Sequence, residues 1–215
     1  MYGPFFCNTF LANPDLKPEE SQNVEFIADF NTRSVFTEAD RFGVNASVFY
    51  NNIDNFIEQD AEVWIGPSMH TTYNNVDEAR LKGFELTFNY GLEDFAAALS
   101  YGQTRGEDKQ TGENISGIPA DKWVLDLNQR FINRSVTTGL RVSHIESQNR
   151  IKSSDNDDYD RYTLADIYAT WEPVTMPNLK LDLSLNNLTD QYYRVAFQEL
   201  YMPGRDVRLA VRYQF

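Results

Sequence analysis

A methionine, a histidine and a tyrosine lie close together in a long polar stretch of the sequence, as Met69, His70 and Tyr73, and Trp64 precedes them in the same stretch. Histidine, methionine and tyrosine are side chains that bind haem iron axially in proteins. A single histidine does not define a site, and an ordinary solvated loop is the alternative. The sequence gives the hypothesis that Trp64, Met69, His70 and Tyr73 contact a ligand from an exposed loop.

A second polar segment, residues 154–160, gathers four carboxylates. Calcium takes about six to eight oxygen ligands, but this segment lacks the regular spacing and closing glutamate of an EF-hand loop. A solvated loop is therefore favoured over a metal site. For catalysis, Ser143 beside His144 cannot act as a pair, because neighbours in a strand point to opposite faces. We expect no enzyme, no metal site and no permanently bound cofactor.

The composition excludes several classes of protein. The 215 residues carry a formal net charge of −13 at pH 7, which argues against nucleic acid as a partner, because phosphate binding needs clustered Lys and Arg. Cys7 is the single cysteine, so no internal disulfide is possible. No stretch reaches the roughly 18 consecutive apolar residues of a membrane-spanning helix. A membrane barrel stays possible, because only every second residue of its strands faces lipid.

Apolar and polar residues alternate from about residue 22 to the C-terminus, which is the pattern of strands. The last segment shows it most clearly, with one face made of Val207, Leu209, Val211, Tyr213 and Phe215. Similar alternation marks residues 24–30, 84–90, 123–131, 136–142, 162–171 and 179–186. We expect about nine strands, most of them close to the roughly 9–11 residues that cross a bilayer at a tilt.

Short and long connections alternate along the chain. Short turns are predicted at 91–94, 133–135 and 175–178, and long polar connections at 58–75, 106–120, 149–159 and 194–205. Short turns at one end and long loops at the other are typical of an outer-membrane barrel. The connection at 31–42 is longer than this rule predicts. A soluble β-sandwich also has one apolar face per strand, but its strands are usually shorter and its solvent face more charged.

The second face of the strands is rich in Asn, Ser, Thr, Gly, Asp and Arg, as in a polar lumen. Arg141 and Lys180 belong to this face, and we expect them to pair with the neighbouring Asp126 and Asp182. Contact of these cations with an anionic substrate is the alternative. The sequence predicts an all-β, antiparallel transmembrane β-barrel segment.

Four motifs, in order along the chain, resemble those of TonB-dependent outer-membrane receptors. ANPDLKPEES (12–21) resembles the NPNL box with the LKPE that follows, and NNVDEARLKGFELTFNY (74–90) resembles the N-x-x-x-A-x-x-x-G-x-E strand. NNLTDQYY (186–193) resembles the NLxDxxY element, and MPGRDVRLAVRYQF (202–215) the entry into the closing strand with its terminal phenylalanine. The motif residues are Asn13, Pro14, Asp15, Leu16, Ala79, Gly83, Glu85, Asn187, Leu188, Asp190, Tyr193, Pro203, Gly204, Arg205 and Phe215.

The resemblance covers nearly the whole chain and implies an incomplete part of a barrel of about 22 strands. It places the protein in the outer membrane of a Gram-negative bacterium. Residues 1–21 would form a loop with the NPDL box, residues 22–215 would form the strands, and the plug domain would be absent. The N-terminus has no signal-peptide pattern, so either the start of the polypeptide is missing or the membrane interpretation is wrong. The resemblance implies that the chain is a fragment.

The same resemblance implies uptake of an iron complex, either haem or a ferric siderophore, as a transported ligand. The box favours haem, although Asp15 stands where the box has its second Asn. The implied partners are the TonB complex, through the missing N-terminal region, the outer-membrane lipid, and the barrel assembly machinery, through Phe215. We expect the fragment to be inactive alone. A passive porin-like channel and an outer-membrane barrel hydrolase are the alternatives.

Overall fold

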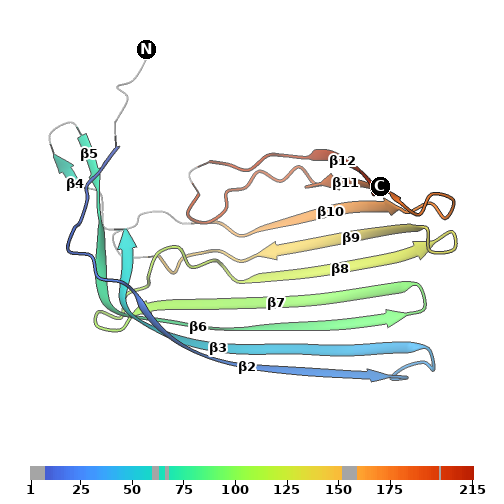
Figure 1. Ribbon diagram of the computed structural model, residues 1–215, viewed down its shortest axis with the longest axis horizontal. Helices are drawn as coiled ribbons and strands as arrows, with labels where there is room; N and C mark the ends of the chain where they lie inside the picture. The colour runs from blue at the N-terminus through green and yellow to red at the C-terminus, as the bar shows by residue number, and fades with distance from the viewer. Residues whose placement is uncertain (1–7, 60–62, 66–67, 152–158, 199) are drawn as a thin grey trace, which may run out of the picture.

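A computed structural model of the chain describes residues 8–59, 63–65, 68–151, 159–198 and 200–215 (Figure 1). Nine strands form one antiparallel sheet: β2 (Glu20–Arg33), β3 (Asp40–Gln59), β6 (Tyr73–Leu92), β7 (Phe95–Asp108), β8 (Lys122–Phe131), β9 (Val136–Ile145), β10 (Tyr162–Trp171), β11 (Leu179–Asn186) and β12 (Asp206–Tyr213). Their order is β12-β11-β10-β9-β8-β7-β6-β3-β2. None of the described residues belongs to a helix long and apolar enough to cross a membrane.

The pairing register gathers the apolar residues on one face of this sheet. Leu125 pairs with Leu99 on one side and with Val142 on the other, and Leu183 pairs with Leu209. Directly paired residues point to the same face, so the alternation of each strand becomes a continuous apolar band. Leu183 and Leu209 are 50% and 69% exposed. An exposed apolar surface of this extent suits lipid hydrocarbon rather than water.

The opposite face carries polar side chains that pair with one another. Arg141 forms an ion pair with Asp126 at 2.8 Å, and the Tyr168 hydroxyl donates to Asp126 Oδ1 at 2.9 Å. Lys180 lies 4.0 Å from Asp182 and 3.5 Å from Glu172. The predicted pairing of Arg141 and Lys180 with these aspartates is confirmed. This is the polar, interior face of a barrel wall.

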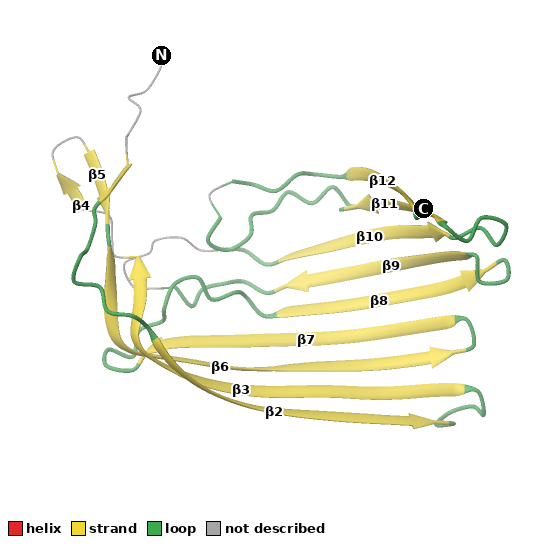
Figure 2. Cartoon of the chain, in the orientation of Figure 1, coloured by secondary structure: helices red, strands yellow, loops and turns green. Residues whose placement is uncertain are grey.

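Within the described residues the sheet is curved and open, with β2 and β12 as its two edges. The short turns gather at one end and the long connections at the other (Figure 2). The long-loop end also holds a separate three-stranded sheet of β1 (Asn8–Phe10), β5 (Ser68–Thr71) and β4 (Val63–Ile65), in the order β1-β5-β4. The predicted class, an incomplete antiparallel barrel segment of about nine strands, is confirmed.

Strand lengths differ from the expectation in the first half of the chain. β8, β9 and β10 have 10 residues each, whereas β3 and β6 have 20 each. Their pairing runs without interruption from Asp40↔Leu92 to Asp54↔Glu78 and again from Phe56↔Val76 to Gln59↔Tyr73. A strand of about ten residues suffices to cross the bilayer, so this pair continues well beyond it.

Two predicted connections are shorter than expected. Segment 1–21, predicted as a loop, contains β1 and the first residues of β2, because backbone pairing with neighbouring strands begins there without any apolar alternation. The connection predicted at 31–42 is a turn between Arg33 and Asp40. The Asp40 carboxylate accepts hydrogen bonds from the backbone amides of Val35, Phe36 and Thr37 at 2.7–2.8 Å. These bonds fold the residues between β2 and β3 into a compact turn.

Candidate ligand-binding site

The four residues predicted to contact a ligand lie in or beside the small sheet at the long-loop end. Met69 and His70 belong to β5, and Met69 pairs with Trp64 of β4. Tyr73 begins β6, two residues beyond the end of β5, and its ring stacks on that of Phe10 with 6.5 Å between centroids. Strand pairing therefore places Trp64 opposite Met69 and Val63 opposite His70, at neighbouring register positions of β4 and β5.

His70 is half-buried in this sheet, opposite Thr9 of β1 and Val63 of β4. Its Nδ1 atom is shielded from solvent and has no hydrogen-bond partner among the described residues. Leaving a buried polar atom unpaired costs roughly 1–3 kcal/mol, so such atoms call for an explanation. An imidazole nitrogen without a protein partner can serve as a ligand for a metal.

The NPDL box fixes the backbone beside this histidine. Asn13 donates from Nδ2 to the Tyr73 carbonyl at 2.9 Å and to Asn74 Oδ1 at 3.0 Å. Asn13 Oδ1 also accepts the amide of Asp15 at 3.0 Å, which closes the turn at Pro14. The first residue of the box therefore binds the start of β6 directly, and Leu16 is half-buried behind it.

A second set of bonds continues this attachment after the box. The Lys17 amide donates to Asn75 Oδ1 at 2.8 Å, and Asn75 Nδ2 donates to the carbonyls of Lys17 and Asn55 at 3.0 and 2.7 Å. The Ile57 amide donates to Glu19 Oε1 at 2.7 Å. Because the segment between β1 and β2 is bonded to β3 and β6, β1 is held where it can pair with β5. The motif and the residues after it thus attach this segment to the start of β6 and the end of β3.

The small residues of the β6 motif lie where the wall packs closely. Ala79 is fully buried in a cluster with Ile115. A Cβ added at Gly83 would lie 2.7 Å from the ring of Phe49 and 2.2 Å from a backbone oxygen, so a larger residue does not fit. Glu85 is exposed. Of these motif residues, Ala79 and Gly83 therefore have packing roles.

The two C-terminal motifs bind each other. Asn187 exchanges two hydrogen bonds with the backbone of Gln191, at 2.8 and 2.9 Å. Asp190 Oδ1 accepts the Arg205 amide at 2.7 Å, and a Cβ at Gly204 would lie 2.5 Å from the same oxygen. These contacts shape the connection between β11 and β12. The same connection holds Leu188, Tyr193 and Pro203, and Phe215 ends the chain exposed.

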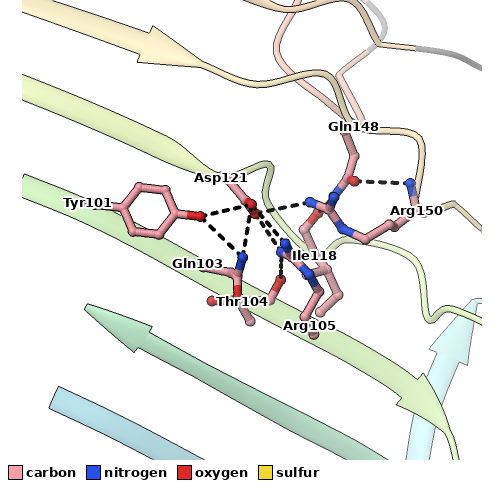
Figure 3. A network of polar contacts seen from close by, with 8 residues as sticks. All are labelled: Tyr101, Gln103, Thr104, Arg105, Ile118, Asp121, Gln148 and Arg150. Carbon is pink, nitrogen blue, oxygen red and sulfur yellow. Dashed lines mark hydrogen bonds and ion pairs between the residues drawn. The ribbon is translucent and has the colours of Figure 1, made fainter. Parts of the chain in front are cut away.

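A polar network that the sequence did not predict joins β7 to the loops around β8 and β9 (Figure 3). Arg105 binds the Asp121 carboxylate with two nitrogens, at 2.5 and 2.8 Å. Arg150 adds a third bond to it at 3.1 Å. Tyr101 and Gln103 each donate to Asp121 Oδ2 at 3.1 Å. One aspartate therefore collects bonds from a strand and from the segment after β9.

Asp121 is buried in this network, at 8% exposure. Burial alone raises its pKa, but the hydrogen bonds from Arg105 and Gln103 and the charges of Arg105 and Arg150 outweigh it and lower the pKa to about 2. The carboxylate is thus ionised at neutral pH and its bonds are satisfied. It joins β7 to the segments before β8 and after β9, and both of its carboxylate oxygens already accept hydrogen bonds from protein side chains.

Among the described residues, no group of three or more His, Cys, Asp or Glu could hold a metal ion. Residues 154–158 of the predicted acidic segment 154–160 lie outside the described residues, and so does Cys7.

A family model for the β-barrel of TonB-dependent receptor-like proteins matches residues 1–188. The chain belongs to this family. TonB-dependent receptor barrels lie in the outer membrane of Gram-negative bacteria, and the resemblance drawn from the motifs is confirmed.

The chain is similar to receptors of this family that are named for haem. It is 32% identical to the "Heme/hemopexin utilization protein C" of Haemophilus influenzae, over 97% of this chain and 31% of that protein. It is 24% identical to the "Hemin receptor" of Yersinia enterocolitica, over 99% of this chain and 32% of that protein. The chain thus spans about a third of the length of these relatives.

Solved structures share the fold. The "Copper transporter OprC" superposes with a TM-score of 0.80 at 20% identity, covering 94% of this chain and 32% of that one. That neighbour is named for copper, whereas the sequence relatives are named for haem. The barrel fold alone therefore does not identify the transported ligand.

Proposed function

We propose that this chain forms part of the wall and outer loops of a TonB-dependent uptake receptor for an iron complex, with haem favoured over a ferric siderophore. One observation carries the proposal. His70, at the long-loop end, has an imidazole nitrogen without a hydrogen-bond partner among the described residues, in a chain whose sequence relatives are named for haem. Histidine is a haem ligand in many proteins, and Tyr73 begins the next strand, three residues further along the chain.

In this proposal, the outer loops capture haem, and the polar face of the sheet lines its way inward. Movement of a plug by the TonB complex would open that way, and the plug and the TonB contact lie outside these 215 residues. The C-terminal strand with Phe215 would be read by the barrel assembly machinery. The chain alone would be inactive, because unpaired strand edges are costly in lipid.

The test uses a haem-auxotrophic Gram-negative host that makes a receptor carrying these residues, with haem as its sole iron porphyrin source. We expect growth to require TonB. We expect His70→Ala to lower haem uptake by at least about tenfold, which corresponds to about 1.4 kcal/mol of binding. His144→Ala is the matched control, since His144 pairs with Trp123 on the apolar face and binds Thr163 at 2.7 Å.

Three outcomes would contradict parts of the proposal. Uptake that persists without TonB would favour a passive channel. Growth on a ferric siderophore but never on haem would refute the cargo. Equal uptake by the His70→Ala and His144→Ala receptors would refute the role of His70 while leaving the receptor function intact.

A further inference from the structure

A hollow of about 470 Å³ lies between the segment that leads into β10 and the connection between β11 and β12. We call it the tyrosine hollow, because tyrosines supply most of its walls. Pockets for small molecules have volumes of roughly 300–1,000 Å³. It lies at the long-loop end of the sheet, on the far side of β7–β9 from the strands that carry His70.

Two pairs of aromatic rings form the walls of the tyrosine hollow. Tyr162 and Tyr193 lie with centroids 4.5 Å apart and their planes tilted by 33°. Tyr192 and Tyr201 stack at 4.0 Å with their planes only 13° apart. Rings paired in this way offer flat apolar faces with hydroxyl groups at the rim. A flat aromatic molecule is the ligand shape that such walls fit.

Two arginines lie among the described residues that line the tyrosine hollow. Among the described residues that line it, Arg161 and Arg194 are the cations and Asp160 is the acid, in a chain with a net charge of −13. The Arg194 guanidinium lies 4.8 Å from the centroid of the Tyr159 ring, a cation–π contact that orients it. Arginine binds carboxylates through two parallel hydrogen bonds.

Tyr162, in a wall of the hollow, belongs to the polar face of the sheet. Tyr162 has the same parity in β10 as Asp166 and Tyr168, and Tyr168 binds Asp126 on the polar face. Burial, followed by the negative charges of Asp166 and Asp206, raises the pKa of Tyr193. Its hydroxyl therefore stays protonated at neutral pH, and it can donate a hydrogen bond to a ligand.

We propose that the tyrosine hollow is a docking subsite for an anionic, flat aromatic cargo, in which the tyrosine rings hold the plane of the molecule and Arg161 and Arg194 bind its carboxylates. This rests on the proposed function and extends it, since haem is a flat macrocycle with two carboxylates. The subsite shares no residue with the His70 region. Because β7, β8 and β9 separate the two regions, the hollow would hold the cargo at a different position from the one at which His70 would bind its iron.

The test measures binding of haem and of haem dimethyl ester, which lacks free carboxylates, to the receptor in detergent, by absorbance titration. We expect Arg161→Ala/Arg194→Ala to weaken haem binding by at least about tenfold, because charge-assisted hydrogen bonds are lost. Binding of the ester should be unchanged. Arg134→Ala is the control, since Arg134 binds Asp94 in a turn at the opposite end.

The walls are tested separately. Tyr162→Ala/Tyr193→Ala should weaken binding of both haem and the ester, and Tyr162→Phe/Tyr193→Phe, which keeps the rings, should retain binding of the ester. Heat-modifiable mobility on gels shows that each variant has assembled. Haem binding at wild-type affinity by the double arginine variant would overturn the subsite alone. A wild-type receptor that binds no haem would overturn the proposed function and the subsite together.

Discussion

Replacement of Asp121 by asparagine tests whether the polar network braces the barrel wall. The carboxylate binds Arg105 twice and Arg150 once, at 2.5–3.1 Å. Asparagine keeps the shape and one acceptor oxygen, but it removes the negative charge that neutralises two arginines. Breaking one side of such a pair leaves the cations without compensation, and this is more costly than the loss of a surface ion pair.

The magnitude follows from the pKa of Asp121, which is about 2 rather than 3.8. At about 1.36 kcal/mol per pH unit, the difference corresponds to about 2.4 kcal/mol. Arg105 and Arg150 are each 28% exposed, so solvent screens part of this energy and we expect about 1–2 kcal/mol. Because the pKa is lower in the folded barrel, this stabilisation is present above about pH 4 and is lost as the pH falls toward 2.

The assay is urea unfolding of the detergent-refolded barrel, followed by gel mobility and tryptophan fluorescence at several pH values. At pH 7, Asp121→Asn should lower the free energy of unfolding by about 1–2 kcal/mol, and the difference from wild type should shrink between about pH 4 and 2. Asp94→Asn is the control: its ion pair with Arg134 is 39% and 65% exposed, and it should cost less than about 1 kcal/mol. Equal unfolding midpoints for the two variants at pH 7 would refute the bracing role.

Two further substitutions test the assignment of the faces. Gly139→Ala would place a Cβ 2.1–2.5 Å from the Tyr168 ring and should lower the free energy of unfolding by about 1–3 kcal/mol, with Tyr168→Ala in the same chain relieving the clash. Leu183→Lys on the apolar face should cost about 2–4 kcal/mol in a bilayer, whereas Ser184→Lys on the polar face should cost much less, and a reversed order in urea unfolding from vesicles would contradict the assigned faces.

The strands that cross the bilayer were predictable because lipid and lumen impose a period of two. β10 and β11 match the predicted segments within a residue. The outer part of β6 was not predictable in this way, because residues such as Asn74, Asn75 and Asp77 extend beyond the lipid, where neither face needs to be apolar. β1, β4 and β5 have only three or four residues, too few for any pattern.

The motifs identified the family but not what their residues do. Asn13 and Asp190 bind backbone and side chains of neighbouring segments, and these contacts depend on pairing between residues up to 61 positions apart. Asp121 and Arg105 likewise meet only through the register of β7 and β8. The tyrosine hollow combines residues of two loops, where the sequence has no periodicity. The sequence alone does not distinguish its tyrosines from the tyrosines of an aromatic girdle.

The position of the Asp121 network has a consequence for how the proposed receptor would move. Among the nine strands, β7, β8 and β9 lie between β3 and β6, which carry the His70 region, and β10 to β12, which carry the tyrosine hollow. The network ties β7 to the segments before β8 and after β9, so it stiffens the wall between the two proposed contact regions. Packed, bonded walls do not deform continuously. Passage of a cargo between the two regions would therefore depend on movement of loops or of a plug, with the distance between the two halves of the wall kept constant.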